Sequence, residues 1–297
     1  MNKVNVPLFC ILAYLPSWSI QIGVILAYGN LEDPRAVPWI IGVMFTPAVV
    51  TIGFALFSRE ARKRIKWRPR WVALPTAIVG VAVPTVIGFA TIALLEITGW
   101  GHSDWFEFST AGVAIAAGPW LLGLGRQGWF IFMVNVFVTG ASFAVLNGLA
   151  AMGEELGWRG FLQGVLVENL GTTRGIVLLG LIWSFWHLPA LLAGYNYPAH
   201  PVLGALVLFP AQLIAASFFL AWLTIRSGSF WPAAIAHGAV NSIEEGVTHN
   251  ISVAVPHLYE DVTRVVLTIL FGLVFWWLLQ RNRGRETAPE TGISVCR

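Results

Sequence analysis

In the stretch Met152-Gly153-Glu154-Glu155-Leu156-Gly157-Trp158-Arg159, the two glutamates directly follow a run, residues 127–153, that contains no Asp, Glu, Lys or Arg. Two further uncharged runs occupy residues 71–95 and 175–225. A helix needs about 20 mostly apolar residues to cross the hydrocarbon core of a bilayer, and each run is longer than that. The sequence therefore predicts an all-α, polytopic transmembrane helical bundle with charged residues placed beside or inside its spans.

The composition supports this class of protein. The chain has 297 residues, of which 57% are hydrophobic and 11% charged, whereas a soluble domain has about 25% charged residues. Its net charge of +3 comes from basic residues beside the apolar runs, which indicates no nucleic-acid binding. Cys10 and Cys296 have neither metal-ligand nor redox spacing.

We predict a single transmembrane domain over residues 1–280 and a polar, disordered cytoplasmic tail over residues 281–297. The N-terminal apolar run lacks a cleavage site, so we expect a retained first span. Residues 111–124 are apolar but short and contain Gly118-Pro119, so we expect an interfacial or re-entrant segment. About eight spans are expected, at 6–28, 37–57, 71–97, 128–152, 175–195, 201–225, 231–250 and 262–280.

The distribution of Lys and Arg predicts the orientation of these spans. With eight spans, 15 of the 18 basic residues fall on one side, and Arg35, Arg126 and Arg264 fall on the other. Basic residues concentrate on the cytoplasmic side of membrane proteins, so we expect cytoplasmic N- and C-termini. The basic cluster at residues 59–70 is interpreted as a topology determinant near anionic lipid.

Charged residues inside a membrane protein usually face its interior and usually have a function. On a helix, Glu155 and Arg159 share one face and can form an ion pair, while Glu154 is rotated by about 100°. Glu154 is then free to act as a general base or acid. The alternative is a helix-end salt bridge at the membrane interface.

Two histidines follow in later spans. His187 lies two residues before Pro189, which can kink the helix, and Trp183 lies one turn earlier, where it can pack against the imidazole. His237 and Asn241 are four residues apart and share one helix face, so their N–H groups can stabilise an oxyanion. For both histidines the alternative is an interhelical hydrogen bond.

Glu244, Glu245 and His249 continue the polar stripe of His237 and Asn241. They line a wet cavity or mark the end of the span, and we favour the end of the span. The sequence contains no His-Glu-x-x-His, no Gly-x-Ser-x-Gly and no phosphate-binding loop. A water activated by a glutamate is therefore the simplest hydrolytic route.

Together these stretches resemble the CAAX-protease and bacteriocin-processing family of intramembrane endopeptidases. That family carries Glu-Glu-x-x-x-Arg, Phe-x-x-x-His and His-x-x-x-Asn or Asp on an eight-helix core. The first motif matches residues 154–159 and the third matches residues 237–241, whereas Trp183 stands in place of the Phe of the second. The resemblance covers residues 150–245, within a family-like core at about 125–280.

The resemblance implies a role for each matching residue. Glu154 would activate water, and His187 would hold or shuttle its proton. His237 and Asn241 would stabilise the oxyanion, and Glu155 and Arg159 would form a supporting pair. We favour a metal-free site, because the spacing from His237 to Asn241 suits oxyanion binding. The alternative is zinc held by Glu154, His187 and His237.

The sequence thus predicts an intramembrane endopeptidase that acts in the lipid bilayer on a peptide or membrane-protein substrate. We expect its site to open to the cytoplasmic half of the membrane, and the chain to be multi-pass in the cell membrane, a prokaryotic inner membrane. One alternative is a non-catalytic scaffold, immunity or sensor-regulating protein of the same fold. Another is a proton-coupled transporter that uses Glu154, His187 and Glu244.

Overall fold

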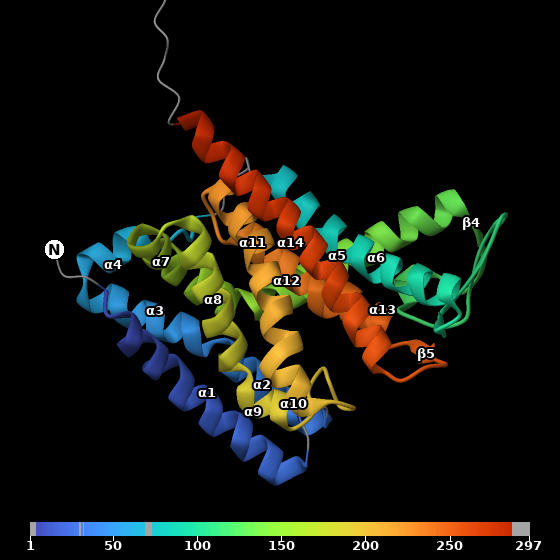
Figure 1. The fold of residues 1–297 in the computed structure, drawn as a ribbon, viewed down its shortest axis with the longest axis horizontal. Helices are drawn as coiled ribbons and strands as arrows, with labels where there is room; N and C mark the ends of the chain where they lie inside the picture. Colours follow the sequence, from blue (N-terminus) through green and yellow to red (C-terminus); the bar gives the residue numbers. More distant parts are fainter. Residues whose placement is uncertain (1–3, 30, 32, 69–72, 287–297) are drawn as a thin grey trace, which may run out of the picture.

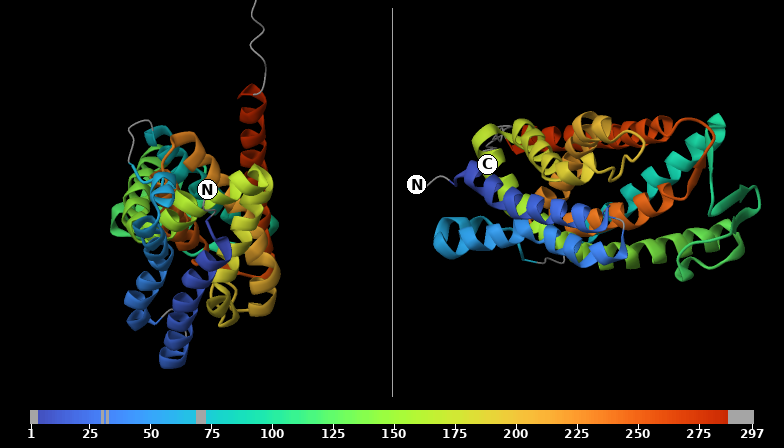
Figure 2. Two further views of the ribbon diagram at one scale, coloured as in Figure 1. Left: turned by 90° about the vertical axis from the view of Figure 1, so that its left-hand side faces the viewer. Right: turned by 90° about the horizontal axis from the view of Figure 1, so that it is seen from below.

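A computed structural model describes residues 4–29, 31, 33–68 and 73–286 of the chain. The described part is mostly helical, and its helices cross one another around α12 (Figure 1). Small strands gather at one end of the molecule, and α1 and α3 lie at the other (Figure 2). The prediction of a mostly helical protein is therefore confirmed.

The elements before the strands are helical. They are α1 (Val6–Tyr28), η1 (Pro34–Ala36), α2 (Val37–Met44), α3 (Thr46–Phe57), α4 (Arg59–Arg64) and α5 (Leu74–Thr98). The strands and the short helix between them are β1 (Gly101–Ser103), β2 (Phe106–Ser109), β3 (Gly112–Ile115), η3 (Trp120–Leu122) and β4 (Gly125–Gly128).

The second half of the chain carries most of the buried polar residues. Its first elements are α6 (Trp129–Gly157), η4 (Trp158–Leu162), α7 (Gln163–Leu170), α8 (Thr172–Trp186) and α9 (Leu188–Leu192). They are followed by α10 (Pro201–Leu203), η5 (Gly204–Leu208), α11 (Phe209–Ser227), α12 (Trp231–Ala239), η6 (Val240–Glu244), α13 (Glu245–Thr248), β5 (Ile251–Val253) and α14 (Leu258–Glu286). In this half, η4, η5 and η6 are π-helical turns.

Within the described residues, six helical segments are long and apolar enough to cross a membrane, so the protein is multi-pass. They are Val6–Tyr28, Pro34–Phe57, Leu74–Thr98, Trp129–Leu170, Pro201–Ser227 and Leu258–Arg281. The predicted span at 175–195 is interrupted at His187, between α8 and α9, and the one at 231–250 is divided into α12, η6 and α13. The count of eight therefore stays a prediction.

The strands correct the all-α prediction. β2, β3 and β4 form an antiparallel sheet, and β1 pairs antiparallel with β5. Residues 111–124, predicted as interfacial or re-entrant, form β3 and η3 and do not span. The reason is local: the two residues between Ser109 and Gly112 close a hairpin, and alternating residues such as Phe106 bury one strand face against α5 and α6.

The predicted polar tail begins later than expected. α14 continues to Glu286, so residues 281–286 extend this helix. The other residues of the predicted tail, 287–297, lie outside the described part of the chain.

Helices α6 and α12 lie unusually close together, because Gly238 has no side chain. A Cβ atom on Gly238 would lie 2.3 Å from the carbonyl oxygen of Ala144 and 2.3 Å from the amide nitrogen of Gly148. Small residues allow such close backbone approach between membrane helices. The contact places His237, the preceding residue, beside the C-terminal end of α6.

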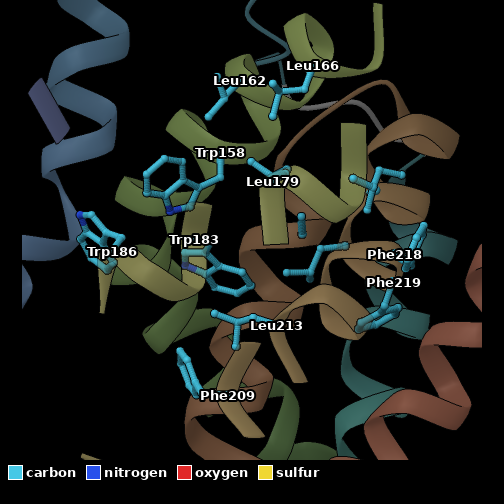
Figure 3. Close-up of a cluster of buried hydrophobic side chains, with 14 of the residues drawn as sticks. Trp158, Leu162, Leu166, Leu179, Trp183, Trp186, Phe209, Leu213, Phe218 and Phe219 are labelled. Carbon is cyan, nitrogen blue, oxygen red and sulfur yellow. The ribbon is translucent and has the colours of Figure 1, made fainter. Parts of the chain in front are cut away.

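The main hydrophobic core fills the space between η4, α7, α8 and α11 (Figure 3). Trp158 and Trp186 are fully or almost fully buried there, with ring centroids 6.0 Å apart and the rings edge to face. Leu179 and Leu213 pack in the same cluster. This core fixes α8 relative to the end of α6, which positions the polar residues described next.

Candidate functional site

The two adjacent glutamates lie in the last turn of α6, where they are buried and bind different partners. Glu154 is 2% exposed, and its Oε2 accepts a 2.7 Å hydrogen bond from Nε1 of Trp183. Glu155 is 0% exposed, and its Oε1 accepts a 2.9 Å hydrogen bond from Nη1 of Arg159. The structure thus contains the predicted Glu155–Arg159 pair, with Glu154 directed elsewhere.

The guanidinium of Arg159 joins three helices. Besides Glu155, it donates to Oγ of Ser217 on α11 over 3.1 Å, and it lies 4.0 Å from the ring centroid of Trp183 on α8. Arg159 is fully buried and belongs to the π turn η4. A buried arginine is tolerated when it is paired and hydrogen-bonded; Nη1 and Nη2 of Arg159 each have a partner, whereas Nε has none.

His237 of α12 also contacts the glutamate pair. Its Nδ1 lies 2.9 Å from Oε1 of Glu155, the same oxygen that accepts from Arg159. The imidazole also packs edge to face on Trp183, with centroids 5.2 Å apart. A carboxylate beside Nδ1 fixes the orientation of the ring and leaves Nε2 for chemistry. No local sequence pattern predicts this contact, because the two residues are 82 positions apart.

His187 lies at the break between α8 and α9. Its Nδ1 lies 2.9 Å from the carbonyl oxygen of Trp183, and its ring packs edge to face on Trp186 and Phe209, with centroids 4.6 and 5.1 Å away. Pro189 occupies the first turn of α9, which explains why α8 stops here, as the sequence predicted.

Trp183 contacts four of the five glutamate, arginine and histidine side chains described above. It binds Glu154, lies under Arg159 and packs against both His187 and His237. The sequence predicted only its packing against His187. Its hydrogen bond to Glu154 depends on the indole N–H, which the Phe expected from the family pattern lacks.

A cavity of about 280 Å³ joins these residues. The cavity is lined by Trp183 and by the four predicted catalytic residues, which are Glu154, His187, His237 and Asn241. Glu155 and Arg159 are not part of the lining. Asn241 is partly buried and lies in the π turn η6, and π turns often occur at functional sites.

The cavity extends further than expected. Glu244 and Glu245 line it, so the preferred interpretation that they mark the end of a span is wrong for both. The reason is the π turn η6, which widens the helix where Glu244 lies. His249 is exposed and is not part of the lining. Gln212 of α11, which the sequence did not single out, also lines the cavity.

The predicted zinc ligands do not form a preassembled metal centre. Glu154, His187 and His237 line the same cavity, but no group of three His, Cys, Asp or Glu side chains in the described residues is arranged to hold a metal ion. Nδ1 of His237 is beside Glu155, and Glu154 is bound to Trp183. The residues present therefore do not fit the zinc alternative as they stand.

Comparison with known proteins finds a family match in the part of the chain that carries this site. Residues 138–243 match the family model described as "Type II CAAX prenyl endopeptidase Rce1-like". This Rce1-like segment contains every residue of the cluster, from Glu154 to Asn241. The match confirms the resemblance inferred from the three motifs.

A relative supports the Rce1-like assignment over a shorter stretch. The chain is 39% identical over 49 residues to "CAAX prenyl protease 2" of Methanococcus maripaludis. The stretch is 16% of this chain and 18% of that relative, so the chain matches less than a fifth of the relative's length.

Proposed function

We propose that the protein is an intramembrane endopeptidase that hydrolyses a peptide bond with a water activated by Glu154. One observation carries this proposal: a single cavity is lined by Glu154, two imidazoles and Asn241, with a second carboxylate, Glu155, held behind His237. A base, a proton carrier and oxyanion donors are the groups that amide hydrolysis requires.

The proposed reaction uses each of these groups once. Glu154 accepts a proton from water, and the water oxygen bonds to the carbonyl carbon of the substrate. His237 and Asn241 donate hydrogen bonds to the resulting oxyanion. The C–N bond then breaks, and the proton passes from Glu154 through His187 to the leaving amine, which leaves the enzyme as it began.

The contact between His237 and Glu155 determines how His237 can donate a hydrogen bond to the oxyanion. With Nδ1–H directed at Glu155, Nε2 donates a hydrogen bond only when the ring carries both protons. Glu155 stabilises that positive charge. The cluster then holds two carboxylates and two cations, Arg159 and His237, and this balance lowers the penalty of burying them.

We further propose eight spans with cytoplasmic termini, in the inner membrane of a prokaryote, and a site that opens to the cytoplasmic half of the bilayer. The concentration of Lys and Arg on one side of the spans supports this orientation. The names of the matched family and relative support a prenylated peptide that ends in a Cys-aliphatic-aliphatic-X box as substrate.

The test is turnover by the purified protein in lipid nanodiscs. Wild-type protein is expected to cleave a farnesylated peptide with such a box, whereas Glu154→Gln protein is not. Glu168→Gln is the matched control, because Glu168 is an exposed residue of α7 that pairs with Arg64. Equal cleavage by wild-type and Glu154→Gln proteins would refute the role of Glu154.

The cavity also supports a second candidate function, proton-coupled transport. Glu154, His187 and Glu244 line the same cavity, as a proton path would require. This candidate predicts substrate-dependent proton flux in liposomes that is lost in Glu244→Gln protein while no peptide is cleaved.

A further inference from the structure

The cavity has a second polar region, formed by Glu244 and Glu245, which we name the acidic end. These residues follow Asn241 on the same helical segment, across η6 into α13. Since a helix rises about 1.5 Å per residue, Glu244 lies about 10 Å along the segment from His237. The acidic end is therefore separate from the cluster around Trp183 but continuous with its cavity.

Glu244 is buried without a direct partner. It is 2% exposed, and within the described residues its carboxylate makes no hydrogen bond or ion pair. Glu245, which is partly buried, likewise has no side-chain partner there. A buried carboxylate without a directly bonded counter-ion is costly, and such groups are normally paired. Two of them on one cavity wall indicate that a ligand supplies the missing charge.

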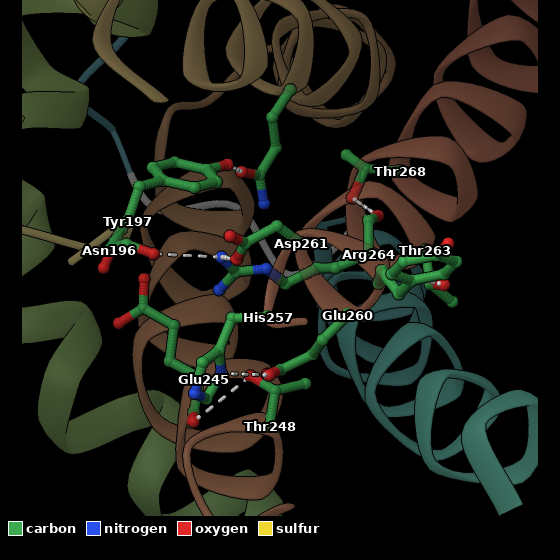
Figure 4. Close-up of polar contacts among 12 residues, drawn as sticks. Asn196, Tyr197, Glu245, Thr248, His257, Glu260, Asp261, Thr263, Arg264 and Thr268 are labelled. Carbon is green, nitrogen blue, oxygen red and sulfur yellow. Dashed lines mark hydrogen bonds and ion pairs between the residues drawn. The ribbon is translucent and has the colours of Figure 1, made fainter. Parts of the chain in front are cut away.

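The nearby basic residue is already engaged. Arg264 of α14 contacts Asp261 over 3.5 Å and the carbonyl oxygen of Asn196 over 3.4 Å (Figure 4). It acts on the acidic end only through space, and it is not part of the cavity lining. His257 is 3.6 Å from Glu260 and is not part of the cavity lining.

Apolar side chains make up much of the cavity lining. Phe209 and Leu213 of α11 and Phe271 of α14 are among them. A lysine side chain combines a long apolar stem with a charged head and can bury the first while it pairs the second. An acidic or neutral polar side chain would meet apolar walls and then two carboxylates.

We propose that the acidic end binds the ammonium group of a basic side chain of the substrate. This inference rests on the proposed peptidase function and adds a specificity determinant to it. An extended peptide advances about 3.3–3.6 Å per residue, so a gap of about 10 Å places the basic residue within about three positions of the scissile bond.

The experiment measures binding separately from turnover. Seven-residue peptides carry one farnesylated Cys and, at each other position in turn, Lys, Gln or Glu. Their affinities for Glu154→Gln protein in nanodiscs are measured by fluorescence anisotropy. We expect Lys to bind at least about tenfold more tightly than Gln at one position, since a desolvated charge pair contributes that much or more, and Glu to bind more weakly than Gln.

When Glu244→Gln is combined with Glu154→Gln, we expect the affinities for the Lys and Gln peptides to differ by no more than about twofold. Glu245→Gln is the second test variant, in case the first protein does not fold. Glu260→Gln is the matched control, because Glu260 lies outside the cavity lining and pairs with His257, so its protein should keep the preference.

The outcomes separate this inference from the proposed function. Affinities that do not depend on Lys at any position, or a preference that survives in both acidic-end variants, overturn the inference. Loss of affinity for the Lys and Gln peptides by the same factor in Glu244→Gln protein also overturns it. A Lys preference in binding without cleavage by wild-type protein keeps the inference and refutes the peptidase.

Discussion

The chain contains two pairs of adjacent glutamates that line or adjoin one cavity, and their surroundings are opposite. Glu154 and Glu155 are bound by Trp183, Arg159 and His237. Glu244 and Glu245 have no hydrogen bond or ion pair among the described side chains. Both pairs adjoin a π turn, so local helix geometry does not explain the difference.

Under the proposed function, buried charge serves two purposes in this protein. Catalysis requires groups held in place before the substrate arrives, because ordering them during the reaction would raise the barrier. Recognition of a charged substrate instead requires an unmatched charge that the substrate completes. The following changes test the first pair, in order of expected effect, and the peptide series described above tests the second.

The largest effect is expected for Glu154→Gln. This change keeps the shape of the side chain but removes the proposed base, and a general base contributes roughly 10²–10⁴-fold to a rate. We expect kcat to fall by that factor, while the thermal unfolding temperature changes little. Single-turnover cleavage of the farnesylated peptide measures the first, and differential scanning fluorimetry the second.

Glu155→Ala should act mainly on stability. It leaves Arg159 and His237 buried without their shared carboxylate, and removing one partner of a buried ion pair costs about 3–5 kcal/mol. Unfolding in lipid nanodiscs measures the change. Glu168→Ala is the control, since exposed pairs such as Glu168–Arg64 contribute at most about 1 kcal/mol. Similar losses for both variants would show that Glu155 is not a structural support.

Gly238→Ala should disturb the contact between His237 of α12 and Glu155 of α6. The added Cβ would meet the backbone of α6 at 2.3 Å, and overpacking of this kind costs about 1–3 kcal/mol. We expect lower stability and slower turnover, because His237 moves away from Glu155. Gly246→Ala is the control on the same segment, since no atom lies within 4 Å of the added Cβ. An equal response of the two variants would contradict the close approach.

Trp183→Phe tests the hydrogen bond to Glu154. The change keeps an aromatic ring under Arg159 but removes the N–H group, and a hydrogen bond to a charged group is worth about 1.5–3 kcal/mol. We expect kcat/KM to fall by at least about tenfold with little change in KM. Trp276→Phe, at an exposed position that bonds Thr173, is the control. A full rate for Trp183→Phe would show that packing alone is required.

The smallest effect is expected from metal removal. If the glutamate pair works without a metal, treatment with 1,10-phenanthroline should leave the rate of peptide cleavage unchanged. Elemental analysis of the purified protein checks the same point independently. Loss of activity on chelation, with recovery on addition of Zn²⁺, would favour the alternative in which Glu154, His187 and His237 hold zinc.

Local spacing predicted much of this arrangement. Glu155 and Arg159 pair because a helix places residues four apart on one face, and Pro189 marks the helix break at His187. The contacts that join α6, α8 and α12 could not be read from spacing. Trp183 reaches Glu154 only because the two helices are packed by residues of the distant core, and no local pattern encodes that.

Two regions show where the sequence patterns stop. Length and hydropathy place residues 111–124 outside the spans, but they do not reveal that part of this segment is a short strand. Glu244 and Glu245 were read as the end of a regular helix, but the π turn η6 changes which residues face the cavity. In both cases the backbone departs from regular helix geometry, and single-sequence patterns assume that geometry.

The π turn η4 has a consequence for how this chain tolerates changes in length. Such a turn accommodates one residue more than an α-helical turn. Deleting one residue within Trp158–Leu162 would therefore restore a regular helix without rotating the segments on either side. The face of α7 that packs on α8 would keep its direction, whereas a one-residue deletion in the regular part of α6 would rotate everything after it by about 100°.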